Sequence, residues 1–428
     1  MKRHLILLFL IAVASPLLYG QYGLHLQFAR EHLASQQFQP ANILFQPAQK
    51  FAVGSDVGFW AANNNISFDA LLLEDNFVSE EAKQEILDQL NGSTQFQAGF
   101  QAAYGHVNVR IKDQLWSFSF RDKFNLGLGF ENPNTAGLIL EGNADYAGQT
   151  VSDDDVRFHL IQYHELAIGR GFQWGKIKAG VHAKLLAGRN MVQVDPLSYS
   201  LFTESDGSQI DLTGDFAYAD DQPASGYPTG FGGVIDMGII YEYSEKITFQ
   251  ASILDVGAIS WDSRELTGDE SFSYEGFDLG DLIGDDGSGD FVFIADTLEN
   301  TFVIDSQETR ITTVLPTRIS LGGTYQLNEK SQLLVSLHSG LTSFAPSLGI
   351  PLLHLGYDRK LKSWLNIGGS LYGGGGDLYG VGLHGRAGIP VGEDKKIGVI
   401  LSADNVLGLV IPSISRGISL NGGLSFTW

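Results

Sequence analysis

The feature that most limits how this chain can fold is an alternation of apolar residues with polar or small ones, which recurs from Phe51 to the C-terminal Trp428. The final segment, GISLNGGLSFTW, shows it clearly, because Leu424, Phe426 and Trp428 fall on one face of a strand and serine and threonine fall on the other. A period of two residues is that of a β-strand with one face against an apolar phase and the other against water. The chain is therefore expected to be all-β.

Two stretches between Leu115 and Phe130 repeat the pattern. LWSFSF places Trp116, Phe118 and Phe120 on one face, and FNLGLGF continues the same face with phenylalanine and leucine. Such weak but repeated alternation is typical of a transmembrane β-barrel, which is apolar toward lipid and polar or small toward its lumen. About fourteen strands are predicted, near residues 50–61, 96–111, 114–130, 156–170, 179–203, 229–243, 246–258, 317–327, 331–341, 347–358, 363–372, 377–388, 395–404 and 417–428.

The connections between these strands differ in length on the two sides of the predicted barrel. Short turns are expected at 112–114, 171–176, 244–246, 328–330, 359–363 and 392–396. Longer loops are expected at 62–95, 131–155, 204–228, 259–316, 342–346, 373–376 and 405–416. Short periplasmic turns and longer external loops are typical of outer-membrane barrels, and an even number of strands leaves both termini in the periplasm. A soluble β-sandwich is the alternative fold.

The first twenty residues predict a secretory signal peptide, because Lys2 and Arg3 precede an apolar run that ends at Ala14, with Ser15, Pro16 and Gly20 beyond it. Residues 21–49 form an N-terminal periplasmic segment, either a plug inside the barrel or a flexible lead-in, and residues 50–428 form the outer-membrane barrel. No later apolar stretch has the roughly 20 residues that a membrane helix needs. Residues 79–92, which end with a glycine, predict a short amphipathic helix. This helix is either packed on the barrel rim or acts as a gate.

Charge and cysteine content exclude several classes of protein. The formal net charge is −22, so an electrostatic partnership with nucleic acid is not expected. The chain has no cysteine, which removes disulfide frameworks and thiolate zinc sites. Neither G-x-S-x-G nor H-E-x-x-H occurs, and the sequence predicts no enzyme, no catalytic residue and no cofactor; an outer-membrane enzyme built from residues on different strands is a third, weaker alternative.

Polar residues on the inward face of two neighbouring strands are the candidates for lining a lumen. With Trp116, Phe118 and Phe120 facing lipid, the inward residues of these strands are Arg157, His159, Tyr163, Glu165, His182 and Lys184. A turn centred near residue 173 would place Glu165 roughly opposite His182 and one step from Lys184. The two interpretations are a structural interior ion pair and a constriction that selects what passes.

The predicted loop after Trp261 is the most acidic part of the chain. Its DDGSGD core supplies Asp285, Asp286 and Asp290 as oxygen ligands between turn glycines, but without the spacing of an EF-hand. A calcium loop is the sharper interpretation and a solvated acidic loop the simpler one. No other metal site is expected.

The order of several short motifs resembles an uncharacterised family of outer-membrane β-barrels from Bacteroidetes-type bacteria, distantly akin to the long-chain fatty-acid transporters. The motifs are FQPA at 45–48 followed by FAVGSDVGF, LILEGN at 138–143, QYHELAIGRGF with Glu165 and Gly169, and AGVHAKLLAGRNMV with Gly180, Lys184, Leu185 and Gly188. Gln46 stands where the family has asparagine. The resemblance implies a location and a fold, and a plug by analogy with the related transporters, but no activity.

The expected function is passive binding and passage of a small solute, and this class of solute includes hydrophobic molecules. The alternative is a non-transporting scaffold that carries external loops to a secretion or surface-attachment partner. Outer-membrane lipid and a small hydrophobic ligand are the expected partners, together with the barrel-assembly machinery, which recognises C-terminal strands with a terminal aromatic such as Trp428.

Overall fold

The computed structural model describes residues 23–45, 51–67, 69–70, 79–90, 92–206, 209–221, 228–274, 305–341, 351–374, 379–392 and 395–428. The predicted signal peptide and the calcium-loop candidates Asp285, Asp286 and Asp290 lie outside these residues. Within them, no helix is both long and apolar enough to cross a membrane.

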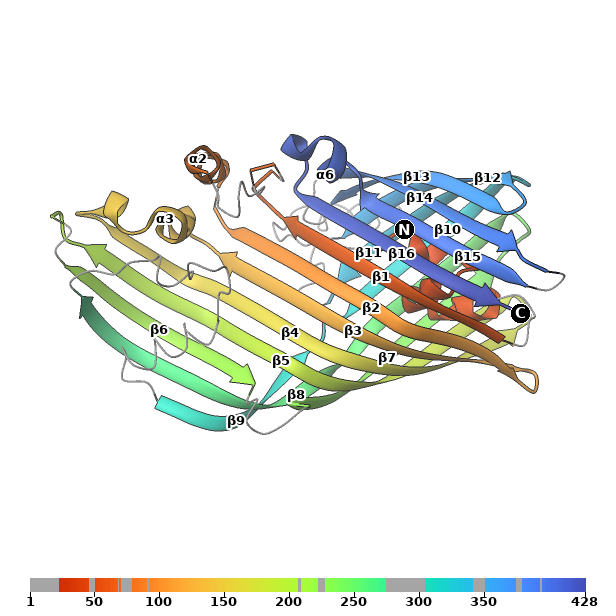
Figure 1. Ribbon diagram of the computed structural model, residues 1–428, viewed down its shortest axis with the longest axis horizontal. Helices are drawn as coiled ribbons and strands as arrows, with labels where there is room; N and C mark the ends of the chain where they lie inside the picture. The colour runs from red at the N-terminus through yellow and green to blue at the C-terminus, as the bar shows by residue number, and fades with distance from the viewer. Residues whose placement is uncertain are drawn as a thin grey trace, which may run out of the picture.

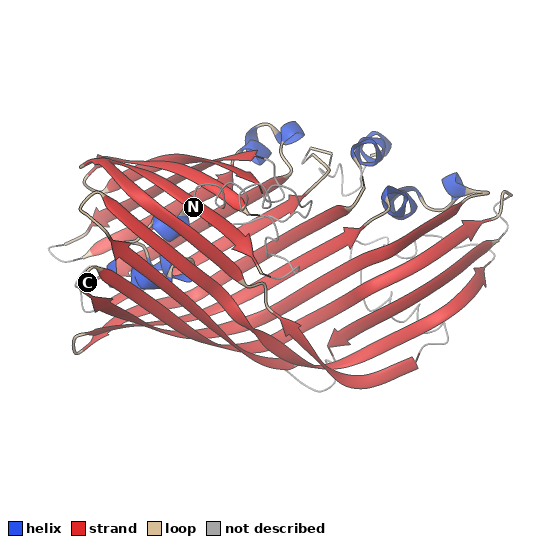
Figure 2. Cartoon of the chain, turned by 180° about the vertical axis from the view of Figure 1, so that it is seen from behind, coloured by secondary structure: helices blue, strands red, loops and turns tan. Residues whose placement is uncertain are grey.

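Fourteen strands close into one antiparallel barrel, drawn in Figure 1 and from behind in Figure 2. The ring is completed where β8 pairs with β10 and β5 pairs with β7. Its members are β1 (Phe51–Asn63), β2 (Thr94–Ile111), β3 (Gln114–Phe130), β4 (Thr150–Trp174), β5 (Ile177–Thr203), β7 (Gly230–Glu242), β8 (Ile247–Tyr274), β10 (Arg318–Asn328), β11 (Ser331–Gly340), β12 (Leu352–Lys362), β13 (Leu365–Gly374), β14 (Tyr379–Pro390), β15 (Lys396–Asn405) and β16 (Gly417–Thr427). The predicted ring of strands is confirmed.

Two further strands lie where the sequence predicted only loops, and those loop predictions were wrong. β6 (Ile210–Asp221) pairs with the outer parts of β5 and β8, in line with β7, while β9 (Asp305–Val314) pairs with β8, in line with β10. β8 itself continues to Tyr274, into the region predicted to be an acidic loop. These strands extend one side of the wall beyond the rest (Figure 1).

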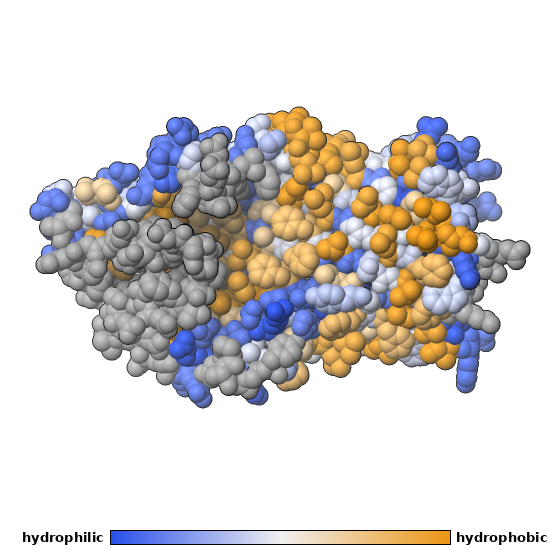
Figure 3. All heavy atoms as spheres, in the orientation of Figure 1, coloured by the Kyte–Doolittle hydropathy of each residue, from blue (hydrophilic) through white to orange (hydrophobic). Residues whose placement is uncertain are grey.

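The barrel has an apolar exterior and a polar interior. On β16, Leu424 is 57% exposed, whereas Ser425 on the opposite face is 7% exposed. On β3, Phe118 and Phe120 are exposed, whereas Ser117 and Ser119 are buried. Figure 3 shows apolar side chains gathered over much of the outer wall. A water-soluble protein buries its apolar residues instead, so this surface suits hydrocarbon.

A β-bulge interrupts the alternation in β8, opposite Asp236 on β7. Leu254 and Asp255 on β8 together oppose Asp236 on β7, and Asp255 has φ +59. Below the bulge the even-numbered residues of β8 face the interior, and above it Ile259 and Trp261 do so instead. The bulge thus turns Asp255 inward and shifts the parity of the rest of the strand.

Residues 23–45, called the N-terminal segment from here on, lie inside the barrel toward the end that carries the short turns and the C-terminus (Figures 1 and 2). They form three short 3-10 helices, η1 (Leu26–Phe28), η2 (Leu33–Gln37) and η3 (Pro40–Phe45), and nearly all are buried. Gly180 of β5 permits this packing, because a Cβ atom there would overlap the carbonyl group of Pro40. Close contact between segment and wall therefore requires glycine at this position.

Short helices lie at the opposite end of the barrel. The predicted helix is confirmed as α2 (Glu80–Gln89), whose first turn is capped by the Ser79 hydroxyl accepting from the Ala82 amide. It contacts α3 (Pro133–Glu141), and both bury apolar residues in one small cluster with Ile66 and Phe130. α2 is thus anchored on the rim.

Candidate functional site in the barrel interior

A group of eight charged side chains, called the charge lattice from here on, spans the lumen in the middle of the barrel. Its members face inward from seven strands and are all buried: Asp56, Arg121, Lys123, Glu165, Lys184, Asp236, Asp255 and Arg318. The four cations and four carboxylates balance in formal charge. Such balance is needed because an unpaired buried charge is costly.

Glu165 and Asp255 are the two acidic centres of the charge lattice. The Glu165 carboxylate lies 2.8 Å from the Lys123 ammonium and 3.5 Å from both the Lys184 ammonium and the Arg121 guanidinium. Asp255 lies 2.7 Å from Lys184 and 3.5 Å from Lys123. Since Lys123 is on β3 and Asp255 on β8, which are not neighbours in the ring, these pairs cross the lumen rather than follow its wall.

The remaining pairs tie the charge lattice to other strands. Arg318 on β10 lies 2.9 Å from Asp255, and Asp236 on β7 lies 2.6 Å from Lys184. Arg121 lies 3.7 Å from Asp56 on β1. The lattice therefore links β1, β3, β4, β5, β7, β8 and β10 at one level of the barrel.

Two of the predicted residues, Glu165 and Lys184, meet in the charge lattice, but the predicted register was wrong. Glu165 is paired with Leu186 across the β4–β5 hairpin, and His182 is paired with Gly169. The reason is the turn, which is a tight one at Gly175 and Lys176 rather than a loop centred near residue 173; Gly175 has φ +56.

The other predicted residues lie at different levels of the interior. The His182 ring approaches Asp236 at 3.8 Å and Ser117 at 3.4 Å, beside the lattice. Tyr163 is buried one step above it. Arg157 and His159 lie farther out, where Arg157 pairs with Asp155 and its side chain is 46% exposed. The six candidates thus follow the lumen wall without forming one site.

An apolar layer lies directly above the charge lattice, on the side of the long loops. It consists of buried side chains that contact one another: Ile161, Tyr163, Leu186, Met191, Ala219, Val234, Ile259, Trp261 and Leu315. Trp261 is fully buried, and its ring packs so closely on Gly188 and Gly230 that a Cβ atom at either would overlap it.

A pocket of about 200 Å³, called the outer pocket, lies above the apolar layer. β2 to β5 line it on one side and residues 312–314 of β9 on the other. Its lining combines apolar Phe96, Leu128 and Phe130 with polar Arg157 and His159. A mixed lining of this kind suits a ligand with an apolar body and a polar end.

The N-terminal segment lies below the charge lattice, and hydrogen bonds hold it against the wall. The Gln27 side chain donates to Ser336 at 3.1 Å and accepts from Ser320 at 2.7 Å. Gln37 donates to the lattice residue Asp56 at 3.0 Å. These bonds satisfy buried polar groups, and each contributes a modest net free energy of about 1 kcal/mol.

His32 in this segment is held neutral. Burial lowers the pKa of His32 to about 4; backbone groups of Gly398 and Gly423 oppose this effect, and the positive charges of Arg386 and Lys396 add to it. Its Nδ1 atom accepts a hydrogen bond from the Ala34 amide. Protonation would therefore break a local hydrogen bond and bury a charge.

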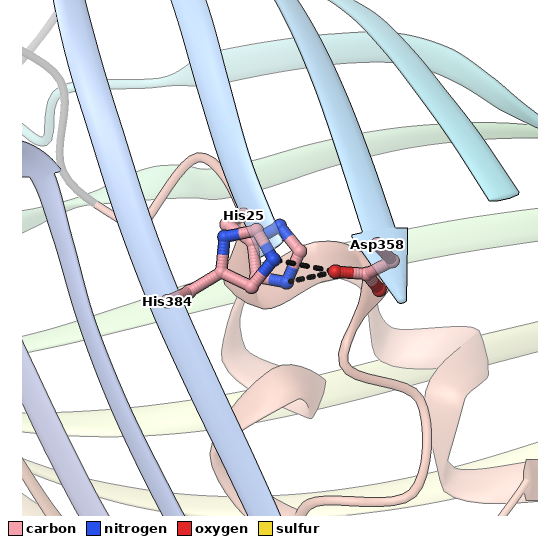
Figure 4. A group of neighbouring side chains, drawn as sticks. All are labelled: His25, Asp358 and His384. Carbon is pink, nitrogen blue, oxygen red and sulfur yellow. Dashed lines mark hydrogen bonds and ion pairs between the residues drawn. The ribbon is translucent and has the colours of Figure 1, made fainter. Parts of the chain in front are cut away.

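Three side chains, called the His–Asp cluster, join the N-terminal segment to the wall (Figure 4). His25 comes from the segment, Asp358 from β12 and His384 from β14, and all three are buried. The Nε2 atoms of both histidines point at Asp358 Oδ1, with that of His25 at 3.6 Å. The sequence analysis missed this cluster, because its members are far apart in the chain and their spacing gives no motif.

Five further members of the charge lattice could have been found by strand parity. Arg121 and Lys123 fall on the same face of β3 as Ser117 and Ser119, but the segments on either side of RDK were interpreted separately. Asp56 and Arg318 likewise face inward on predicted strands. Asp236 also keeps the parity of β7, whereas Asp255 gave no such signal, because the bulge breaks the alternation of β8 there.

The fold and the interior define a class: a closed antiparallel β-barrel of fourteen strands with an apolar exterior and a polar, charge-paired interior. The chain belongs to a family of unknown function, DUF5723, which matches residues 40–391. The resemblance to an uncharacterised barrel family is thereby confirmed. No curated protein matches the chain.

Solved barrels are similar to the chain at low identity. The toluene transporter TodX of Pseudomonas putida is 13% identical, with a TM-score of 0.45, 96% of this chain covered and 94% of that one. A FadL homologue of Pseudomonas aeruginosa is 11% identical, with a TM-score of 0.46 and coverage of 92% and 93%. The toluene transporter TbuX of Ralstonia pickettii is 7% identical, with a TM-score of 0.46 and the same coverage.

Proposed function

We propose that this chain is an integral outer-membrane β-barrel that takes up a small hydrophobic or amphipathic solute in the outer pocket and lets it pass inward when the N-terminal segment moves. Glu165, His182 and Lys184 line the path below the pocket. In this role the side chains bind, orient and exclude, and none of them reacts.

The apolar exterior supports the membrane location. Closed barrels are the β-structures that satisfy every backbone hydrogen bond within a bilayer, and exposed side chains such as Leu371, Leu383 and Leu401, each more than half exposed, would otherwise face water. The short turns and both termini then lie in the periplasm and the long strands β4, β5 and β8 reach outward.

The observation that carries the proposal is the order of layers along the lumen: outer pocket, apolar layer, charge lattice, N-terminal segment. A scaffold needs only a filled interior. Here an amphipathic pocket lies at the outer end, while at the inner end the barrier is a separate segment held by noncovalent contacts. We propose that this segment is the plug that controls passage.

Planar-bilayer conductance and solute uptake into liposomes test this function on two proteins, the full chain and a variant that lacks residues 23–45. Heat-modifiable electrophoretic migration verifies that both barrels are folded. The full chain should conduct rarely, and the variant should open frequently and admit small apolar solutes faster. A folded variant that neither conducts nor admits any tested solute would overturn the proposal in favour of a scaffold.

The C-terminal strand supports insertion by the barrel-assembly machinery, which we propose as a partner. β16 ends at the periplasmic rim, where the backbone of Trp428 pairs with Phe51 and its side chain is 41% exposed. Phe426 lies beside it, with ring centroids 5.1 Å apart. This leaves an aromatic terminal signature accessible at the membrane edge.

A further inference from the structure

The His–Asp cluster is unusual because two imidazoles converge on one carboxylate oxygen. His384 Nε2 hydrogen-bonds Asp358 Oδ1. His25 Nε2 points at the same oxygen, 3.6 Å away, and neither ring nitrogen of His25 has a hydrogen-bond partner. The two rings are stacked, with planes 11° apart (Figure 4). His25 is 2% exposed, so bulk solvent does not reach it.

A cation would satisfy all three atoms once the two rings turn apart, because imidazole binds a metal in its ring plane and the stacked rings now direct their Nε2 lone pairs nearly parallel. The two Nε2 atoms and Asp358 Oδ1 lie within 4.8 Å of one another. Tetrahedral zinc, with bonds of about 2.0–2.1 Å, holds its ligand atoms roughly 3.3 Å apart. The separation of 3.6 Å between His25 and Asp358 already fits that spacing, and the shorter contact to His384 would open slightly on binding.

The ligand types select the kind of metal. Two imidazoles and one carboxylate suit Zn²⁺ and the neighbouring divalent transition metals, whereas Ca²⁺ and Mg²⁺ prefer oxygen ligands throughout.

The wall also orients the carboxylate. Arg386 and Gln332 both donate to Asp358 Oδ2, each at 3.0 Å, which leaves Oδ1 for a metal. Such outer partners fix a ligand's orientation. The positive charge of Arg386 weakens cation binding, so we expect an affinity below that of structural zinc sites with four protein ligands.

We propose that His25, Asp358 and His384 form a binding site for one divalent transition-metal ion, with Zn²⁺ as its model, that fastens the N-terminal segment to β12 and β14. The segment supplies one ligand and the wall supplies two. A bound metal would therefore oppose displacement of the segment, and its removal would loosen it. This inference does not depend on what passes through the barrel.

The test uses the full chain, purified in detergent without a histidine tag and stripped with a chelator. Titration with Co²⁺, followed by its visible absorption, and competition with Zn²⁺ give stoichiometry and affinity; Ca²⁺ is the negative control. The variants are His25→Gln and His384→Gln. The matched control is His338→Gln, which removes a buried histidine that also contacts the segment, at 3.1 Å from Gln27. Heat-modifiable migration verifies folding of each.

The wild type and the control should bind one Co²⁺ with the intense absorption of four-coordinate cobalt, displaced by Zn²⁺. Each cluster variant should lose more than the roughly 10–100-fold in affinity that removal of an outer partner typically costs. No saturable binding by the wild type, or equal binding by the wild type and either folded cluster variant, would overturn the proposal. The readout is independent of conductance, so failure here and failure of the proposed passage are distinguishable.

Discussion

Removing one charge from the charge lattice should destabilise the whole barrel, and Glu165→Gln is the sharpest case. Glu165 is 1% exposed and faces three cations, Arg121, Lys123 and Lys184, at 2.8–3.5 Å. The substitution keeps the shape of the side chain but leaves the lattice with one excess buried positive charge. Breaking a buried pair in this way costs about 3–5 kcal/mol.

Restoring the balance should recover much of that loss. Lys123→Met removes one of the cations that face Glu165, so the double variant Glu165→Gln with Lys123→Met is again balanced. We expect it to be no less stable than either single variant, with a coupling of roughly 2–3 kcal/mol between the two sites. Unfolding by urea in detergent micelles, followed by tryptophan fluorescence and electrophoretic migration, measures the three free energies.

An exposed pair provides the control. Glu31 lies 3.4 Å from Lys396 and its side chain is 71% exposed, so Glu31→Gln should change the free energy of unfolding by less than about 1 kcal/mol. If Glu165→Gln were as mild as Glu31→Gln, or if the losses of the two lattice variants simply added, the lattice would not be a coupled buried network.

The remaining predictions concern the N-terminal segment and the apolar layer. Gly180→Leu should push Pro40 away from the wall and raise the open probability in planar bilayers, because the side chain has no room; unchanged conductance would show that the segment does not block the path. The folded-state pKa of His32, about 4, is below the ordinary value of 6.5. The contribution of neutral His32 to the free energy of unfolding is therefore fully present above pH 6.5 and is lost as the pH drops toward 4, by on the order of 3 kcal/mol. His32→Gln should remove that part of the acid sensitivity, measured by unfolding at several pH values, and an identical pH profile would refute the assignment. Gly188→Ala should displace the Trp261 ring and shift its fluorescence to longer wavelength as water enters the apolar layer; an unaltered spectrum and unaltered stability would contradict close packing there.

The ring of strands could be predicted because lipid imposes one rule on every membrane-facing residue. Where a strand crosses hydrocarbon, one face must be apolar, so alternation marks it whatever the interior contains. β6 and β9 escaped prediction because they extend the wall beyond that band. The requirement for an apolar face does not apply to β6, to β9 or to the outer part of β8.

The interior could be predicted only where the alternation was unbroken. Glu165 and Lys184 were found because β4 and β5 keep their parity around both residues, although the hairpin register depended on the turn at Gly175. Asp255 was hidden by the bulge that turns it inward. The His–Asp cluster depends on how the N-terminal segment enters the barrel, and that is a matter of three-dimensional packing between residues remote in sequence.

The central claim is that the wall faces hydrocarbon outward and polar groups inward, and site-directed spin labelling tests it most directly. The chain contains no cysteine, so single cysteines can be introduced and labelled at outward Leu371, Leu383 and Leu401 and at inward Ser370, in protein reconstituted into liposomes. The account predicts that labels at the three leucine positions collide with oxygen dissolved in the bilayer and not with a water-soluble nickel chelate, and that the label at Ser370 is shielded from lipid. Leucine positions freely accessible to the nickel chelate would contradict it.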